Sequence, residues 1–497
     1  MTSALARRTA SPRHSSPRTR LLLVAAAGAA SLWCMPASRA QAQPAPAPAA
    51  QPAPAPADAA PAPAEAAPAP QPPPPPTAPV TGKWAATLYG FVQLDFIRDS
   101  TQSFNDAAGN TQIAKEGSYG ADHGRMQFSP RDSRIGIKIK APELGSVKVN
   151  ATFETDFFGV SAAPQNGNSE NGFFGNPAFR IRVADFELKS PVVDVLVGQT
   201  WQLMGWQPLY LPATWDIPGL PGQLFSRSLQ LRVSKTIKTS GVTIETAAAA
   251  ARPPQRNSGT PEGEAGLRIS LDGRTGTAML YSTTKMYLPL SIAFTGDVRR
   301  FTVPEFSAAP ERANSKTTVG GAVDLFVPIL PGTEAKQDGS LSLSGELAYG
   351  QATSDLYTAM ASGISFPSLP VPDGEDAAPP FAAGVDPGMV TYDMDGSLRS
   401  IDWLSYWASL QYWVPPFKGA VWVAATYSHL ESLNSDELDA ATPASARKSL
   451  DWAGGMVGYD PTSALRFVGG YSYYRDEYLD GTVGVNHRVG LTGFLFF

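Results

Sequence analysis

The chain has 497 residues, of which 17% are charged and 10% aromatic, a length that suits two or three ordinary domains or one large β-barrel. Residues 1–42 hold six Arg, no Lys and no acidic residue, which leaves 33 basic against 44 acidic residues, a balance of -11. This acidic balance argues against nucleic acid as a partner. No later run of eighteen or more apolar residues is present, which excludes a transmembrane helix after residue 42.

Residues 1–42 have the organisation of a secretory signal peptide. A basic region around Arg7 to Arg20 precedes a short apolar core over 21–30 and small residues up to Ala42. A retained membrane anchor is the alternative, but the short core and the A-x-A-like ends favour cleavage near Gln43. The only cysteine, Cys34, would leave with this peptide, so the mature chain is predicted to have no disulfide.

Residues 43–83 form a Pro/Ala-rich segment, with 16 prolines between residues 43 and 80. Such a composition cannot bury a core, and we expect a disordered, extended tether in the periplasm. A passive spacer and a segment that contacts the cell wall or a periplasmic partner both remain open.

From Trp84 onward the sequence alternates between apolar and polar residues with a period of two, which predicts β-strands. In the first strand Val92, Leu94 and Phe96 fall on one face, and Gln93 and Asp95 fall on the other. A soluble sandwich would bury the apolar face against a second sheet. A membrane barrel would turn that face to lipid and the charged face to its lumen.

The number of such strands favours the barrel. Together with the first strand, the candidate strands lie near 134–140, 147–156, 179–189, 193–201, 226–236, 242–251, 264–272, 290–299, 316–327, 340–350, 400–414, 419–430, 448–459, 464–474 and 487–497. Short linkers such as 141–146 and 460–463 alternate with long ones such as 202–225 and 351–399, the asymmetry expected of a periplasmic and an external end. We therefore predict an all-β fold in which residues 84–497 form a transmembrane antiparallel barrel of about 16 strands.

Aromatic residues gather near strand ends, for example Trp403 with Tyr406 and Trp407, and Tyr412 with Trp413. Aromatic belts at the two membrane interfaces would explain this distribution, and so would the general preference of aromatic residues for sheets. The last strand ends in Phe497, with Leu495 two residues before it. A final strand of this kind resembles the signal that the barrel-assembly machinery of the outer membrane recognises.

Charged residues on the predicted lumen faces are the first candidate functional residues. A basic wall facing an acidic one would set a transverse field that favours anionic or dipolar solutes, whereas mutual pairing would only brace the wall. The candidate basic residues are Arg131, Arg134, Lys138, Lys140, Arg180, Arg182, Arg232 and Arg268, and the candidate acidic residues are Asp95, Glu154 and Asp156.

The segment 200–225 is the second candidate. It directly follows a predicted strand and contains several prolines, and it carries Trp201, Trp206, Trp215 and Asp216. An inward fold would make it a constriction loop stiffened by its prolines, and packing outside against a neighbouring subunit is the alternative.

Acidic residues concentrate between residues 301 and 400, with 13 acidic and 4 basic residues. Calcium would bridge such carboxylates, but their spacing does not match an EF-hand loop, and a solvated anionic surface is the preferred interpretation. The histidines His123, His429 and His487 show no metal-ligand spacing, and no G-x-S-x-G elbow is present. We therefore expect neither a cofactor, nor a metal, nor an enzyme.

Three stretches resemble the DcaP-like family of outer-membrane porins, and more distantly the general trimeric porins. They are LYGFVQLDF at 88–96, RDSRIGIKIKAPELGSVKVNATFETDFFG at 131–159 and FRIRVADFELKSPVVDVLVGQTW at 179–201. The resemblance implies a sixteen-stranded homotrimer with an Arg-lined pore narrowed by an inward loop. Arg134 corresponds to the S-R-x-G arginine, and Arg180 and Arg182 to the R-x-R pair. The Pro-rich 43–80 departs from the helical extension of some members.

The combined expectation is an exported outer-membrane porin that passes small hydrophilic solutes by diffusion and favours anionic or dipolar organic molecules. Outer-membrane lipid and the barrel-assembly machinery would be its partners. A structural or adhesive barrel with a plugged lumen and surface-binding loops is the alternative.

Overall fold

The computed structural model describes residues 83–109, 112–159, 178–206, 219–279, 285–305, 311–357, 384–393, 397–436 and 446–497. They all belong to one of two compact units, Thr77–Phe497. The predicted signal peptide and almost all of the Pro/Ala-rich segment lie outside the described residues.

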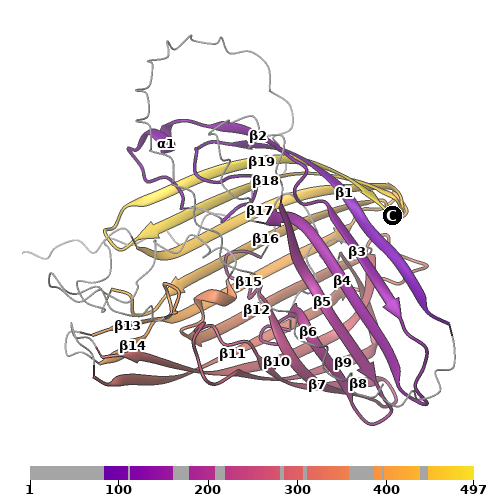
Figure 1. The fold of residues 1–497 in the computed structure, drawn as a ribbon. Helices are drawn as coiled ribbons and strands as arrows, with labels where there is room; N and C mark the ends of the chain where they lie inside the picture. The colour runs from indigo at the N-terminus through magenta and orange to yellow at the C-terminus, as the bar shows by residue number, and fades with distance from the viewer. Residues whose placement is uncertain are drawn as a thin grey trace, which may run out of the picture. The chain divides into compact units, whose positions relative to one another are not determined.

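The described part of the chain is almost entirely β-structure (Figure 1). Its strands are β1 (Ala85–Asp99), β2 (Arg125–Ser129), β3 (Arg134–Lys140), β4 (Lys148–Gly159), β5 (Ala178–Lys189), β6 (Asp194–Trp201), β7 (Arg227–Lys238), β8 (Val242–Ala251), β9 (Glu262–Met279), β10 (Lys285–Pro304), β11 (Ala313–Leu330), β12 (Leu341–Gln351), β13 (Val390–Tyr392), β14 (Leu398–Ser400), β15 (Asp402–Trp413), β16 (Val421–Ser432), β17 (Arg447–Thr462), β18 (Leu465–Tyr478) and β19 (Val483–Phe496). Two short helices, α1 (Tyr119–Asp122) and η1 (Ser354–Leu356), complete it. Within these ranges no helix is long and apolar enough to cross a membrane.

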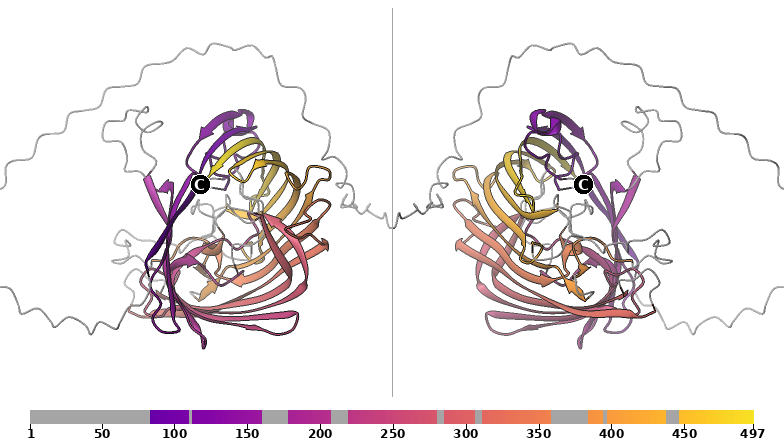
Figure 2. Two further views of the ribbon diagram at one scale, coloured as in Figure 1. Left: turned by 90° about the vertical axis from the view of Figure 1, so that its right-hand side faces the viewer. Right: turned by 90° about the vertical axis from the view of Figure 1, so that its left-hand side faces the viewer.

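The strands close into one antiparallel barrel (Figures 1 and 2). Each strand of the wall pairs with the next along the chain, and β1 pairs with β19 to complete the ring. The two short strands β2 and β3 pair with successive halves of β1, so they form one wall strand interrupted at residues 130–133. The 17-stranded sheet is therefore a closed barrel of sixteen wall strands, and the small β13–β14 hairpin stands apart from it. This confirms the predicted fold.

Alternation along each strand separates an outward from an inward face. On β1, Val92, Leu94 and Phe96 are exposed, whereas Gln93 and Asp95 between them are buried. The same pattern of exposed apolar and buried polar side chains continues on β10, β11 and β19. A soluble sandwich would bury its apolar face, so this inversion is the pattern of a barrel with an apolar exterior and a polar interior.

The ring closes at the end of the chain. The backbone N–H of Gly90 donates to the carbonyl oxygen of Phe497 at 3.0 Å, and the N–H of Phe497 donates back to the carbonyl of Gly90 at 3.1 Å. Leu495 lies outward, opposite Val92. Gly90 has to be small, because a Cβ on it would lie 2.2 Å from the carbonyl oxygen of Arg134.

The two ends of the barrel differ in their connections. One end, which we call the short-turn end, carries brief links such as 190–193, 239–241 and 463–464. The other, the long-loop end, carries the connections 100–124, 202–226 and 352–401. The alternation of short and long linkers predicted from the sequence is therefore present.

The aromatic residues correct one sequence prediction. Tyr406 and Tyr471 are exposed on the outer face, as an interfacial belt requires. Trp403, Trp407 and Trp413 are buried and point inward, so of the two explanations the outer belt is wrong for these three residues. Trp403 packs inside the barrel against Met204 and Leu224 of the connection between β6 and β7, whereas Trp413 packs against Trp422 and other inward side chains of the wall.

Candidate functional site

A network of three arginines and two carboxylates lies on the inner face of β3, β4 and β5. Arg182 contacts both acids, with Nε 2.9 Å from Glu154 Oε1 and Nη1 2.7 Å from Asp156 Oδ2. Arg180 binds Asp156 at 2.6 Å, and Arg134 lies 3.5 Å from Glu154. The structure thus brings together five of the predicted residues as paired charges, with one more positive than negative charge.

The members of this network differ in their access to water. The side chain of Arg182 is 3% exposed, whereas that of Arg180 is 40% exposed. Arg131 is 33% exposed and binds Asp106 at 2.9 Å. The guanidinium carbons of Arg131 and Arg180 lie 4.5 and 5.3 Å from the ring centre of Phe158. Arg131 and Arg180 are therefore the more accessible of these arginines, and both lie close to the Phe158 ring.

Lys138 and Lys140 continue the basic wall along β3 and are exposed. Lys138 Nζ lies 4.7 Å from the ring centre of Tyr89, whose hydroxyl donates to Glu154 at 3.0 Å. Tyr89 itself packs over Gly136, where a Cβ would lie 2.4 Å from its ring. Neither Tyr89 nor Phe158 was predicted as a site residue. Alternation puts Tyr89 on the face of Gln93 and Asp95, but its contact with Glu154 spans 65 residues and has no local signal.

Arg232 and Arg268 extend the basic residues onto β7 and β9. Arg232 donates to Gln230 Oε1 at 2.9 Å and to the carbonyl oxygen of Trp201 at 2.6 Å. Arg268 binds Glu245 at 2.6 Å and lies 4.9 Å from the ring centre of Trp206. Both side chains are half-buried and partnered, so they are less accessible than Arg180.

Asp95 is the predicted acidic residue that lies apart from this network. It is buried, and it accepts hydrogen bonds from Gln93 Nε2 at 3.0 Å and from the hydroxyl of Thr492. The contact with Thr492 ties β1 to β19 across the closure of the ring.

The connection between β6 and β7 enters the barrel. We call its described parts, 202–206 and 219–226, the first and second arms of an inner strap. In the first arm, the N–H of Leu203 donates to Glu264 at 2.8 Å, and Gln202 Nε2 donates to the same carboxylate at 3.1 Å. The N–H of Gly205 donates to the hydroxyl of Thr295 at 2.8 Å. The first arm is therefore held by the inner faces of β9 and β10.

The second arm contacts strands further round the ring. The N–H of Gly222 donates to Ser428 Oγ at 2.8 Å, and that hydroxyl donates to the carbonyl of Gly219 at 2.6 Å. The N–H of Leu224 donates to Glu346 Oε1 at 2.8 Å. The second arm therefore lies on the inner faces of β16 and β12.

Four aromatic or acidic residues were predicted to form a constriction here. Trp206 ends the first arm and packs on Gly266, where a Cβ would lie 2.7 Å from its ring. Trp201 is at the end of β6, and its ring lies tilted against that of Phe225, with 4.5 Å between the ring centres. Trp215 and Asp216 lie outside the described residues.

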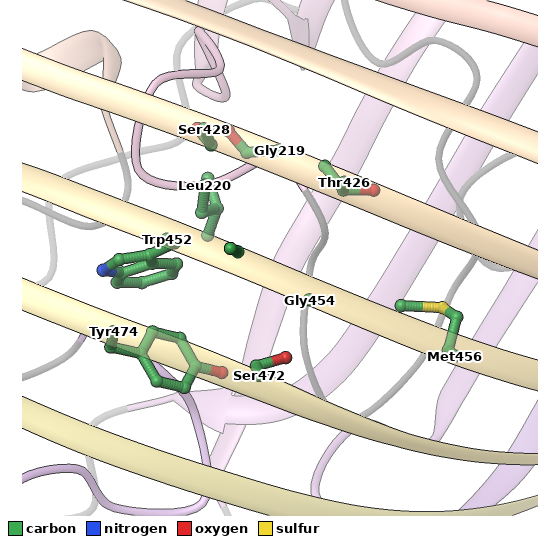
Figure 3. Close-up of a pocket in the computed structure, with 10 residues that line it drawn as sticks. Gly219, Leu220, Thr426, Ser428, Trp452, Gly454, Met456, Ser472 and Tyr474 are labelled. Atoms are coloured by element: carbon green, nitrogen blue, oxygen red, sulfur yellow. Dashed lines mark hydrogen bonds between the residues drawn. The ribbon is translucent and has the colours of Figure 1, made fainter. Parts of the chain in front are cut away.

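A pocket lies between the second arm and the wall (Figure 3). Leu220 of the strap faces Trp452 and Tyr474, and the hydroxyl groups of Thr426, Ser428 and Ser472 lie along the same wall. Its free volume of about 20 Å³ is enough for about one water molecule. This pocket is therefore part of the seat of the strap rather than a ligand site.

A second, deeply buried charge network was not predicted from the sequence. Arg299 on β10 binds Asp297 and Asp355 at 2.6 Å each and Glu262 at 2.7 Å. It also donates to the carbonyl oxygen of Ala352 at 3.1 Å. These contacts fix the connection after β12 against the wall. The alternation of β10 turns Arg299 inward, but Glu262 and Asp355 lie 37 and 56 residues away in the sequence, so no local pattern predicts the pairing.

The predicted acidic surface is only partly described. Asp386 pairs with Arg256 at 2.5 Å, and Asp393 pairs with Arg399 at 3.4 Å. Asp373, Glu375, Asp376 and Asp395 lie outside the described residues. Among the residues that the structure describes, no group of three or more His, Cys or acidic side chains is placed to hold a metal ion.

Comparison with known proteins gives no family model that matches the chain and no match among curated proteins. Solved structures do match. The outer membrane channel DcaP of Acinetobacter baumannii has a TM-score of 0.56 at 18% identity, over 83% of this chain and 97% of that one. The chain has the fold of this channel. The fold implied by the sequence resemblance to the DcaP-like porins is thereby supported.

Other porins are more distant. OprB of Pseudomonas putida has a TM-score of 0.46 at 11% identity, over 83% of this chain and 94% of that one. An anion-selective porin from Comamonas acidovorans has a TM-score of 0.45 at 11% identity, over 84% and 100%. At these scores neither carries an argument about function.

Proposed function

We propose that the protein is an outer-membrane porin, a water-filled channel through which small hydrophilic solutes diffuse. The observation that carries the proposal is a closed sixteen-strand wall with an apolar exterior, a polar interior and basic side chains accessible from inside. Likeness in fold to the DcaP channel supports it. Catalysis and cofactors play no part in it.

The location follows from the same wall. A closed barrel leaves no strand edge unpaired, so its backbone can lie in the hydrocarbon core of a membrane. Its exposed Leu, Val and Phe side chains suit contact with lipid tails. Export by the predicted signal peptide would bring the chain to the outer membrane. The short-turn end would then face the periplasm, together with the Pro/Ala-rich segment that precedes β1.

A preference for small anionic or dipolar organic solutes is the second part of the proposal. The inner carboxylates Asp156, Glu264 and Glu346 are buried and are used by neighbouring side chains or backbone N–H groups. Lys138 and Lys140 are exposed, and Arg131 and Arg180 keep a third or more of their side-chain surface. Since the buried carboxylates are neutralised or hydrogen-bonded by their own partners, the accessible bases would dominate the field that a solute meets.

The strap would narrow the channel. Both of its arms lie against inward-facing side chains. At the end of the first arm, the ring of Trp206 packs on Gly266 and lies beneath the guanidinium of Arg268. In this proposal Trp201, Trp206, Trp215 and Asp216 belong to the constriction.

A plugged structural or adhesive barrel is the second candidate, because apolar side chains also gather inside. Met204 and Leu224 of the strap form a buried cluster with Leu356, Trp403 and Leu430. If such clusters filled the cross-section, the lumen would not conduct.

The homotrimer implied by the sequence resemblance belongs to the proposal as well, and native mass spectrometry of the detergent-purified protein would test it.

Planar-bilayer recording with the purified mature chain separates the two candidates. The folded state is first verified by heat modifiability on gels, so that misfolded protein is not mistaken for a closed barrel. The porin proposal expects stepwise single-channel openings. Folded protein that gives no conductance would contradict it and favour the plugged barrel.

A further inference from the structure

Both arms of the strap converge on one side chain, Glu346. It lies at the middle of β12 and points inward, and it is almost completely buried. Its Oε1 accepts the N–H of Leu224 from the second arm at 2.8 Å. Its Oε2 faces Gly205 of the first arm, where a Cβ would lie only 2.8 Å away. A single carboxylate thus touches two segments of the strap that are 19 residues apart.

The backbone of the first arm is shaped for this contact. Gly205 has a φ of +79°, a conformation that residues with a Cβ rarely adopt. The absence of a side chain on Gly205 also leaves room for Leu224, because a Cβ on Gly205 would lie 2.8 Å from the Cβ of Leu224. A turn closed by the Trp206 N–H and the Leu203 carbonyl at 2.8 Å holds Gly205 in place. Gly205, Leu224 and Glu346 therefore form one close contact.

Glu346 also faces a second carboxyl group. Asp324 on β11 is its cross-strand partner in the register, and Asp324 is buried and inward as well. Directly opposed residues have Cβ atoms about 5 Å apart, and like charges at that separation are destabilising. Two buried carboxyl groups in this position are accommodated when they share one proton.

We propose that Glu346, supported by Asp324, is the clasp that sets the position of the inner strap and thereby the aperture of the channel. It is a positioning residue, because it acts through the backbone of the strap and not on a solute. The inference about the aperture rests on the porin function proposed above, whereas the inference about the strap does not.

The test compares Glu346→Ala with Glu346→Gln in the full mature chain. A glutamine retains an oxygen that accepts the Leu224 N–H and an amide that donates to Asp324, so it should preserve the clasp. Alanine removes both contacts. Asp476→Asn is the control for general disturbance of the interior, because Asp476 is an equally buried inward carboxylate on β18 that accepts a backbone N–H from Ile113 and pairs with Arg447 at 3.0 Å, both outside the strap.

Two readouts are needed. Amide hydrogen exchange of peptides covering 202–206 and 219–226 should show about a tenfold or greater loss of protection in Glu346→Ala, the effect of losing a buried hydrogen bond. Glu346→Gln and Asp476→Asn should keep wild-type protection there. In bilayers, Glu346→Ala should change single-channel conductance and increase open-channel noise, and the other two variants should not.

Unchanged exchange of both arms in folded Glu346→Ala protein would overturn the clasp. Lost protection without any change in conductance or noise would overturn its link to the aperture. If the wild-type protein itself does not conduct, the porin proposal fails, while the exchange result still decides whether Glu346 holds the strap.

Discussion

Two walls of the barrel interior use charge in opposite ways. On β3–β5, arginines outnumber the carboxylates that bind them, and Arg180 stays accessible to water. On β9–β12, the carboxylates Glu264 and Glu346 are buried and accept backbone N–H groups of the strap. The β3–β5 wall therefore has arginine side chains that water can reach, whereas the carboxylates of the β9–β12 wall are bound to the strap. The residue types alone would suggest two comparable charged walls.

The difference teaches that burial, not sequence count, decides which charges a pore displays. Burying a charged side chain removes its hydration, and this cost is offset only where opposite charges and hydrogen bonds surround the group. Arg299 illustrates this, since three carboxylates and a carbonyl surround it. Arg299 therefore stabilises the structure, and its charge is not accessible from the lumen.

The largest effect is expected from Arg299→Ala. Removal of the cation leaves the buried Glu262 and Asp297, and the partly buried Asp355, without a counter-charge, a change that typically costs about 3–5 kcal/mol. Thermal unfolding followed by heat modifiability should show a clear loss of stability. The matched variant Arg300→Ala changes the adjacent exposed arginine and should be close to wild type; equal losses in both would show that Arg299 is not specially buried.

A smaller loss is expected from Gly205→Ala. The substitution places a Cβ in a left-handed conformation, which costs about 1–2 kcal/mol, and brings it 2.8 Å from both Glu346 and Leu224. Gly241→Ala is the control, because Gly241 has a φ of +84° but nothing within 4 Å of its missing Cβ. Melting temperatures should fall further for Gly205→Ala than for Gly241→Ala. The same fall in melting temperature for both variants would show that the close contact of Gly205 with Glu346 and Leu224 does not contribute to stability.

The strands could be predicted from sequence, whereas an inward and an outward position of the strap both stayed open, and its contacts could not be predicted. Alternation at Val92, Leu94 and Phe96 is a local signal, and it gave the outward face. The pairing of Leu224 with Glu346 spans 122 residues, and nothing in either neighbourhood announces it. Likewise the sequence marks Arg180 and Arg182 as equivalent, whereas a local bulge in β5 opposite residues 154–155 and the surrounding acids leave only the first accessible.

Arg180→Gln should weaken the anion preference of the channel. A unit charge about 4 Å from an ion in water is worth about 1 kcal/mol, which corresponds to at most about a fivefold change in the permeability ratio. Arg300→Gln, on the outer face, should leave the ratio unchanged. The reversal potential under a salt gradient measures both; no difference between the two variants would argue against Arg180 as a lumen charge.

The smallest effect is expected at the long-loop end. Lys115 lies 2.6 Å from Asp480, and this hydrogen bond lowers the pKa of the Asp480 carboxyl to about 2. Because the folded-state pKa is below the unfolded value, the stabilisation is present above about pH 4 and is lost as the pH falls toward 2. The pair is exposed, so Asp480→Asn should leave the melting temperature at pH 7 almost unchanged. A marked drop at pH 7 would contradict this.

The most direct test of the account is the reversal potential of the wild-type channel across a salt gradient. If the accessible bases on β3–β5 govern the lumen while the acids of β9–β12 stay buried in the hold on the strap, the potential will have the sign of anion preference. A cation-favouring potential from the folded protein would show that the buried carboxylates reach the solute path, and would contradict the division between the two walls.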